Sequence, residues 1–312
     1  MAEPVIQTKG LTKAYGHGEK RTLALENLDL TIQPGEIFGY LGPNGAGKTT
    51  TIRLLLDFIR PDAGSATIFG QDVRTSSVEL HKQIGYLPGE LNLWKNQRAD
   101  RIVSYFGNVR GMQDTRYAQE LAERLKLDMT KRVRDYSTGN KRKLGIVLAL
   151  MHKPRLLILD EPTSGLDPLM QQTFNQLMHE VRADGRTVFL SSHVLSEVQA
   201  ICDRVAILRD GRLRAVESIE KLTHVDFRWV TINFRDAIPA GMGTELEKLD
   251  GTSHFSQNGK SVRLQLTGDF DPVIRAIGGG YVTDLRVQEP TLEEIFLAFY
   301  GNGSAAAMQQ EA

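Results

Sequence analysis

The segment from residue 42 to residue 50 constrains the fold of this chain more than any other part of its sequence. It reads G-P-N-G-A-G-K-T-T and fits the pattern G-x-x-x-x-G-K-[ST]. A short apolar run, Ile37–Leu41, precedes it. Apolar residues at helical spacing follow it before Pro61, namely Ile52, Leu55, Leu56 and Ile59. The sequence therefore predicts a strand, a glycine-rich loop and a helix, in the order typical of a phosphate-binding loop.

This loop supplies the candidate nucleotide-binding residues. Backbone N–H groups of such a loop can surround phosphate oxygens, and the N-terminus of the following helix adds a positive partial charge. Lys48 is expected to reach the β and γ phosphates of ATP, and Thr49 to bind Mg²⁺. The alternative is a turn that is merely rich in glycine. The full candidate set is Gly42, Pro43, Asn44, Gly45, Ala46, Gly47, Lys48, Thr49 and Thr50.

A second candidate site is the acidic pair Asp160 and Glu161, which follows the continuous apolar run Leu156–Leu159. Such a run is typical of a buried parallel strand, whose carboxyl end lies at the edge of the sheet where ligands bind. Asp160 is predicted to support the hydrated Mg²⁺, and Glu161 to orient and deprotonate the attacking water. An isolated Asp-Glu pair is more often a solvated strand end. Beside a phosphate-binding loop, catalysis is the favoured interpretation.

Strand and helix patterns alternate up to about residue 220, which predicts an α/β domain with a parallel sheet covered on both faces. A helical subdomain is expected at about 90–150. From about Lys221 apolar and polar residues alternate strictly, which indicates half-buried strands and a second, α+β domain over 221–302. A chain of 312 residues is long enough for two domains. The final stretch, 303–312, is expected to be a disordered tail.

Composition and charge exclude several classes of function. The 38 Lys and Arg balance the 38 Asp and Glu, so no overall field attracts nucleic acid, and no nucleic-acid partner is expected. The longest apolar run, 146–151, is far shorter than the about 20 residues of a membrane span. No secretory signal is recognised at the N-terminus, and the single Cys202 fits a reducing compartment.

Four further motifs, taken in order with the two above, make the first 220 residues resemble the ATP-binding cassette (ABC) ATPases. Tyr15 resembles the aromatic residue that stacks on adenine. The segment Ser137, Thr138 and Gly139 resembles the family signature, which contacts the γ-phosphate held by the opposing subunit. Asp167 resembles the loop that joins the two sites of the dimer, and His193 resembles the switch histidine.

The resemblance implies a P-loop NTPase cassette that binds ATP and Mg²⁺ and works as a dimer of two copies. It also implies a separate membrane-spanning permease and a peripheral location at the cytoplasmic face of the membrane. The segment Pro290–Phe296, with a predicted helix over 291–300, is similar to the C-terminal accessory domain of prokaryotic exporters of the multidrug and antibiotic efflux type. The implied direction of transport is therefore export.

The chain departs from the family pattern at two places. The signature has Thr138 and Asn140 where Gly and Gln are usual, so a Cβ is expected to crowd the turn at Thr138. The predicted strand from Ile84 to Pro88 is followed by Gly89 and Glu90, where the family usually places a Gln that contacts Mg²⁺. We expect Glu90 to substitute for this Gln as an oxygen ligand or contact.

Three alternatives remain open from the sequence. The first is a cassette ATPase of repair or translation, which the absence of a long insert between Lys48 and Gly139 disfavours. The second is a small-molecule kinase, in which His193 and the signature have no evident task. The third is a nucleotide-sensing module with little turnover, which the missing Gln favours.

Overall fold

The computed structural model describes residues 3–16, 18, 21–223 and 227–288. The chain divides into two compact units, residues 1–219 and 220–312. The predicted helix over 291–300, the motif Pro290–Phe296 and the predicted tail over 303–312 all lie outside the described residues.

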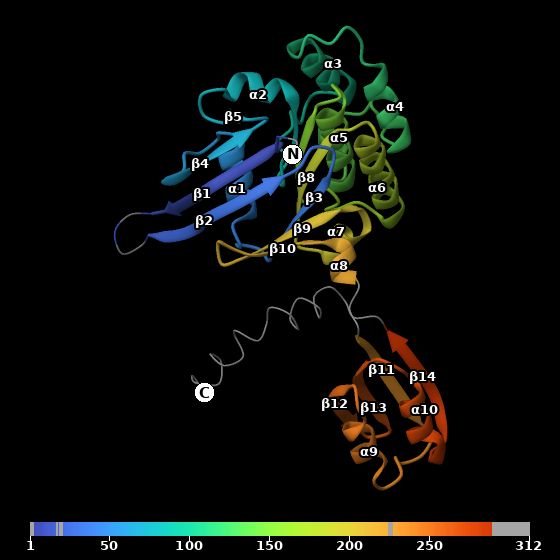
Figure 1. The fold of residues 1–312 in the computed structure, drawn as a ribbon. Helices are drawn as coiled ribbons and strands as arrows, with labels where there is room; N and C mark the ends of the chain where they lie inside the picture. The colour runs from blue at the N-terminus through green and yellow to red at the C-terminus, as the bar shows by residue number, and fades with distance from the viewer. Residues whose placement is uncertain (1–2, 17, 19–20, 224–226, 289–312) are drawn as a thin grey trace. The chain divides into compact units, whose positions relative to one another are not determined.

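A six-stranded sheet forms the centre of the first unit, as Figure 1 shows. Five neighbouring strands are parallel, and only the edge strand β10 is antiparallel. Every residue of the two central strands β7 and β8 is buried. The prediction of an α/β fold is confirmed. In spatial order the strands are β10 (Arg212–Ser218), β9 (Arg204–Arg209), β3 (Ile37–Leu41), β8 (Thr187–Ser192), β7 (Leu156–Asp160) and β6 (Ile84–Leu87).

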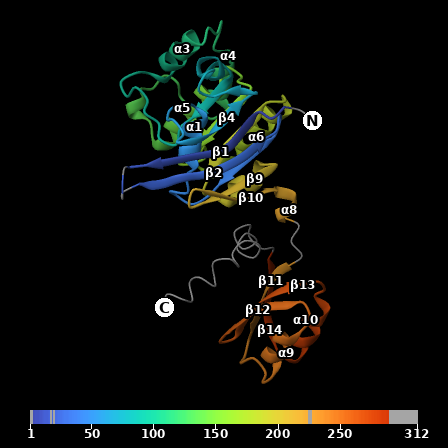
Figure 2. The ribbon, with the colours of Figure 1, turned by 60° about the vertical axis from the view of Figure 1, so that its left-hand side comes forward.

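A second sheet of the first unit is antiparallel, which the sequence did not predict. Its strand β2 lies beside β10 of the central sheet (Figure 2). Residues of both sheets share one hydrophobic core, which is the reason the two sheets pack together. In spatial order this sheet contains β2 (Thr22–Ile32), β1 (Ile6–Tyr15), β4 (Ala63–Ile68) and β5 (Gln71–Asp72).

The helices of the first unit follow the predicted pattern with one correction. Helix α1 ends at Leu55 and not near Pro61, because the chain turns at Asp57, whose φ is +57°. Within the predicted helical subdomain, helix α5 begins at Thr138, because Ser137 caps its N-terminus. The helices are α1 (Lys48–Leu55), α2 (Ser77–Gln83), α3 (Ala99–Val109), α4 (Arg116–Arg124), α5 (Thr138–Leu150), α6 (Pro168–Ala183) and α7 (Leu195–Ile201). A short helix, α8 (Ile219–Thr223), spans the boundary between the two units in the sequence.

The second unit is an antiparallel four-stranded sheet with two short helices, the α+β character expected from its alternating sequence. The alternating apolar residues of β11 and β13 face the helices and form the core, with Val230, Ile232, Val262 and Leu264 fully buried. In spatial order its strands are β12 (Thr252–Asn258), β13 (Ser261–Thr267), β11 (Phe227–Phe234) and β14 (Val282–Gln288), and its helices are α9 (Met242–Lys248) and α10 (Asp271–Ala276).

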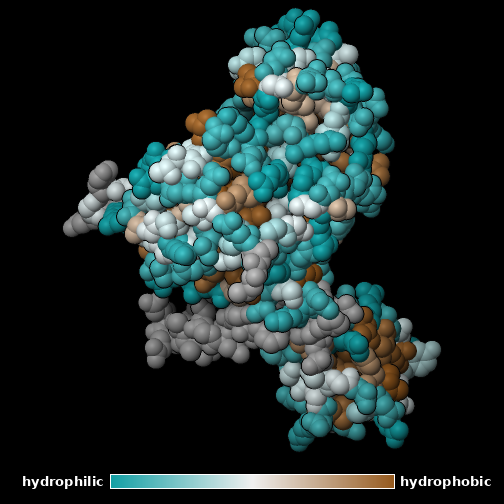
Figure 3. All heavy atoms as spheres, turned by 45° about the horizontal axis from the view of Figure 1, so that its top comes forward, coloured by the Kyte–Doolittle hydropathy of each residue, from teal (hydrophilic) through white to brown (hydrophobic). Residues whose placement is uncertain are grey.

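The surface is mainly hydrophilic on the face drawn in Figure 3, where hydrophobic residues are scattered over the first unit and gather on one side of the second. Scattered apolar residues are normal on a soluble surface, whereas gathered ones are more informative. Among the residues that the structure describes, none of the helices has the length and the apolar character needed to cross a bilayer.

Close packing of α5 against β6 is a requirement of the first unit, and Gly85 makes it possible. A Cβ at this position would lie 2.1 Å from the carbonyl oxygen of Ala149. We expect Gly85→Ala to lower the free energy of unfolding by about 1–3 kcal/mol, since the clash involves a backbone atom that cannot rotate away. Denaturant titration followed by circular dichroism measures this change. Gly107→Ala in α3 is the control, because its added Cβ meets no backbone atom, only side-chain atoms of Thr115 at 3.3 Å and Met112 at 4.0 Å. A loss of stability as large in the control would contradict the packing argument.

Candidate functional site

The order of the central strands brings three separate parts of the sequence to one edge. Strand β8 lies between β3 and β7, and all three run in the same direction. Their carboxyl ends therefore place the loop after β3, Ser191 at the end of β8 and Asp160 at the end of β7 side by side. Asp160 and Ser191 are paired residues in the strand register.

The loop from residue 42 to residue 47 depends on glycine at defined positions. Gly45 and Gly47 have φ values of +83° and +106°, which side chains rarely adopt. At Gly42 a Cβ would lie 2.4 Å from Leu208 O, and at Gly47 it would lie 2.4 Å from Ala24 O. Gly47 is also the residue before helix α1, so the loop leads directly into the helix N-terminus.

Lys48 is the first residue of α1, and only 6% of its surface is exposed. Its ammonium group donates to Gly42 O at 2.6 Å and to Pro43 O at 3.3 Å. It also lies 3.4 Å from Glu161 Oε1. These contacts hold the ammonium group at the mouth of the loop, where phosphate oxygens are natural partners.

Thr49 and Asp160 are adjacent although 111 residues separate them in the chain. The Thr49 hydroxyl donates to Asp160 Oδ2 at 3.0 Å. The Ser191 hydroxyl donates a short hydrogen bond to the other carboxylate oxygen, Oδ1. Asp160 is only 2% exposed, so this pair of hydroxyl donors fixes the orientation of a buried carboxylate.

Glu161 has an unusual backbone, with φ of +51°. Its amide nitrogen donates to Ser191 O at 3.1 Å, which turns the chain sharply at the end of β7. Its Oε2 atom lies 2.8 Å from His193 Nδ1. Left-handed backbone in a residue other than glycine is a form of strain that is often found at functional sites. The carboxylate thus lies between a lysine and a histidine, in position to act as a base.

A cavity of about 540 Å³ is lined by the loop and by Lys48, Thr49, Asp160 and Glu161, whereas Ser191 and His193 do not line it. Glu90, Gly89 and Arg142 also line it, whereas Tyr15 and the signature residues 137–139 do not. Burial, together with the charge of Asp160, raises the pKa of Tyr86 in its wall to about 12. Tyr15 lies at the end of β1, 41% exposed, with Lys13 Nζ 5.8 Å from its ring centre.

The signature residues lie on the surface at the start of α5. The Ser137 hydroxyl accepts a hydrogen bond from Asn140 N at 3.2 Å, as the N-cap of the helix. Ser137 and Thr138 are exposed. Thr138 is not among the residues with positive φ, so the expected crowding at its Cβ does not require a strained backbone.

The loop that contains Asp167 packs against the signature. A Cβ on Gly139 would lie 2.6 Å from Gly165 O, so glycine permits this contact. Asp167 itself caps α6 and accepts a hydrogen bond from Met170 N at 3.0 Å. Within one chain, the signature residues 137–139 and the loop that contains Asp167 therefore form one exposed surface, the signature corner.

Two residues of the site were missed by the sequence analysis. Ser191 could have been found, since it follows a buried strand just before His193. Arg142 gave no signal, because it lies among apolar and basic residues of α5. Only 6% of its surface is exposed, and it lines the cavity.

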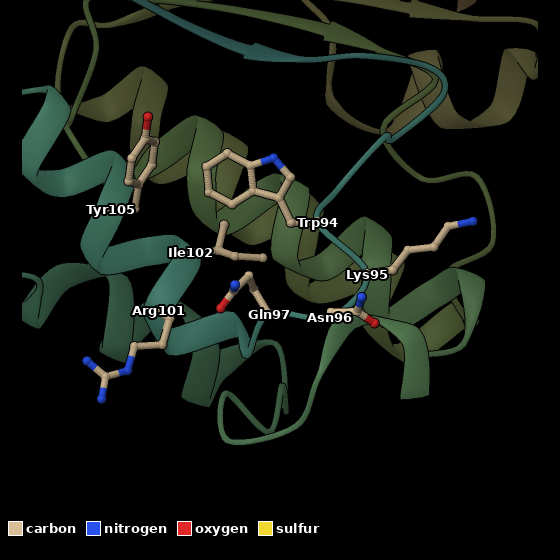
Figure 4. Close-up of a pocket in the computed structure, with 7 residues that line it drawn as sticks. All are labelled: Trp94, Lys95, Asn96, Gln97, Arg101, Ile102 and Tyr105. Atoms are coloured by element: carbon tan, nitrogen blue, oxygen red, sulfur yellow. The ribbon is translucent and has the colours of Figure 1, made fainter.

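A separate cavity of about 580 Å³ lies in the helical part of the first unit. Figure 4 shows Trp94 and Tyr105 on it, with Ile102 near them and Lys95 and Arg101 pointing away on either side. The Trp94 and Tyr105 rings are half exposed, and their centres are 4.8 Å apart. No residue of the phosphate-binding loop lines this cavity.

Comparison with known proteins gives the class. The family model for the ABC transporter matches residues 25–164. The bacitracin transport ATP-binding protein BcrA of Bacillus licheniformis is 31% identical over 315 residues, which cover 96% of this chain and 98% of that protein. The linearmycin resistance ATP-binding protein LnrL of Bacillus subtilis is 34% identical, with 68% of each chain covered.

A solved structure described as the ATP-binding subunit of an ABC transporter is similar with a TM-score of 0.64 and 27% identity. The similarity covers 70% of this chain and 91% of that one. The chain therefore belongs to the ABC transporter ATP-binding proteins. Within this family it is an ATP-binding and ATP-hydrolysing subunit.

Proposed function

We propose that this chain powers an exporter of antibiotic-like compounds, working as two copies bound to a separate permease at the cytoplasmic face of the membrane. The printed names of its relatives, which refer to bacitracin transport and linearmycin resistance, support the substrate class. One observation carries the enzymatic part: Glu161 lies between Lys48 and His193, next to the bonded pair of Thr49 and Asp160.

The described residues fit MgATP. The loop from Gly42 to Gly47 and the start of α1 would hold the phosphates, with Lys48 at the β and γ positions. Thr49 and Asp160 would hold Mg²⁺, since hydroxyl and carboxylate oxygens suit this ion and the two side chains already meet at 3.0 Å. When bound, Mg²⁺ neutralises charge on the phosphate oxygens.

Glu161 is the proposed base. Its carboxylate accepts a proton from the water whose oxygen attacks the γ-phosphorus, and ADP leaves with the bridging oxygen. His193 holds Oε2 at 2.8 Å and so fixes the direction of the carboxylate. This step uses no group from a second substrate, which distinguishes hydrolysis from kinase chemistry.

The signature corner is proposed to complete the site of the other copy. Ser137, Thr138 and Gly139 do not line the cavity of their own chain, and the first two are exposed. The N-terminus of α5 carries a positive partial charge that suits a γ-phosphate. Asp167 would lie near the same junction, and Tyr15 is proposed to contact adenine from its exposed strand end.

Replacing the proposed base tests this mechanism. We expect Glu161→Gln to abolish turnover while ATP binding remains, because the amide keeps the shape of the carboxylate but cannot accept the proton. The rate of phosphate release should fall by about 10²-fold or more. Size-exclusion chromatography with light scattering should detect a stable dimer with ATP and none with ADP.

Arg116→Met, which removes an exposed cation of α4, serves as the control and should hydrolyse ATP at the normal rate. Normal turnover by Glu161→Gln would show that another group is the base. Tight ATP binding by the unchanged chain with no phosphate release would instead favour the nucleotide-sensing alternative.

Glu90 is proposed to contribute an oxygen contact in place of the usual Gln. It follows β6, is exposed, and lines the same cavity as Asp160 and Thr49. A carboxylate at this point can bind a water of the Mg²⁺ shell.

Removing this carboxylate gives a direct test. We expect Glu90→Ala to lower the ATPase rate by about tenfold and Glu90→Gln to restore part of it, because the amide keeps one oxygen acceptor. Steady-state assays at saturating MgATP compare the two variants. An unchanged rate in Glu90→Ala would reject this role.

The cavity at Trp94 is the proposed docking surface for the permease. Two half-exposed aromatic rings flank it, which is the composition of an interface hot spot. Lys95 and Arg101 lie at its margin, so a partner segment with an apolar side chain and acidic neighbours would fit.

A substitution of the central ring measures this contact. We expect Trp94→Ala to reduce co-purification with the co-expressed permease by about tenfold or more, since hot-spot aromatics carry much of the binding energy. Phe58→Ala, which removes another exposed aromatic ring of the first unit, should leave co-purification unchanged. Equal recovery of both variants would place the permease elsewhere.

A further inference from the structure

Arg142 connects two parts of the molecule that the proposed function uses separately. It lies on α5, the helix whose N-terminus carries the signature, and only 6% of its surface is exposed. Its Nη1 donates to Pro88 O at 2.8 Å, and its Nη2 donates to Gly89 O at 2.6 Å. One rigid guanidinium group thus binds two successive carbonyl groups of the loop after β6.

The same loop lies against the candidate metal site. A Cβ on Gly89 would be 3.2 Å from Asp160 Oδ2. That oxygen is the acceptor of the Thr49 hydroxyl at 3.0 Å. The Gly89 backbone therefore lies beside this carboxylate with little free space between them, and a displacement of the loop toward Asp160 would reduce that space.

Packing of α5 against the loop leaves little freedom for independent movement. A Cβ on Gly145, which lies one turn beyond Arg142, would be 2.6 Å from Leu87 Cδ1 and 2.9 Å from Leu91 Cδ1. The helix thus touches the residues on both sides of the Pro88 and Gly89 carbonyl groups. Movement of α5 would move the loop with it.

Electrostatics explains why an arginine is tolerated here. Burial lowers the pKa of Arg142, while the charges of Asp160 and Glu161 oppose this shift and stabilise the cation. A buried cation needs such partners, because desolvation is otherwise costly. The groups that stabilise this cation therefore lie in the proposed ATPase site or at its margin: the carbonyl groups of Pro88 and Gly89 and the carboxylates of Asp160 and Glu161.

We infer that Arg142 is a positioning residue that couples the signature helix to the metal-binding carboxylate through the Pro88 and Gly89 carbonyl groups. Contact of the signature with the nucleotide of the other copy displaces α5. Arg142 transmits this displacement of the helix to the loop beside Asp160. This inference rests on the proposed function.

Steady-state kinetics of the purified full-length chain tests it with Arg142→Met, which removes all donors but keeps an apolar stem. We expect kcat to fall by about tenfold or more and the Mg²⁺ concentration for half-maximal activity to rise by about threefold or more. The KM for ATP should stay within about twofold, because the groups that bind the phosphates are unchanged. Arg142→Lys should recover part of kcat, since an ammonium group can still donate to one carbonyl group.

Arg110→Met is the matched control. Its guanidinium group donates to Ile84 O at 3.4 Å, at the opposite end of the same strand β6. It loses the same charge and a carbonyl contact, but this contact is not in the loop after β6, so the variant should keep kcat and the Mg²⁺ dependence of the unchanged chain. Circular dichroism confirms that each variant is folded.

Three outcomes would overturn the inference: unchanged kcat and Mg²⁺ dependence in Arg142→Met, equal losses in Arg110→Met, or a change confined to the KM for ATP. Failure of the proposed function is recognised separately, because Glu161→Gln would then form no ATP-dependent dimer. If Glu161→Gln dimerises with ATP and Arg142→Met is unaffected, only the role of Arg142 is rejected.

Discussion

The hydrogen bond between Thr49 and Asp160 depends on the whole central sheet, and the chemistry depends on that bond. It joins the helix after β3 to the end of β7, with β8 between them. Ser191 of β8 binds the second oxygen of the same carboxylate. The parallel direction of these strands is what places all three groups at one edge, because only parallel strands end together. A buried carboxylate held in this way keeps its orientation when nucleotide binds and leaves.

Left-handed backbone and close packing both occur at this edge. Gly45, Gly47 and Glu161 all have left-handed backbone within it. Gly42, Gly85 and Gly139 each lie so close to a carbonyl oxygen that no side chain fits. Such positions persist only where the surrounding structure fixes them, and they prepare the backbone to approach a ligand. The well-packed core of the central sheet, which includes the fully buried Ile37 and Phe189, holds these backbone positions in place.

The proposed mechanism divides the work between a rigid part and a moving part. The strand ends hold the base and the metal ligands, whereas α5 carries the signature at its tip and Arg142 inside. Two copies closing on ATP would move α5 relative to the sheet, and hydrolysis would release it. The permease contact proposed at Trp94 comes shortly after the loop of Pro88 and Gly89 in the chain. In this proposal one segment therefore contributes to both the metal site and the contact with the membrane partner.

The sequence by itself determined the glycine loop and the buried strand before Asp160, because each depends on residues that are neighbours in the chain. The local backbone conformation of such segments depends on the residue types at neighbouring positions, which the sequence shows directly. Tertiary structure alone decided the antiparallel second sheet, the early end of α1 at Leu55, and the contacts of Ser191 and Arg142. Those features depend on which strands become neighbours and on how closely a helix packs. Such contacts between distant segments form only when the core excludes water, and they leave no periodic pattern in the sequence.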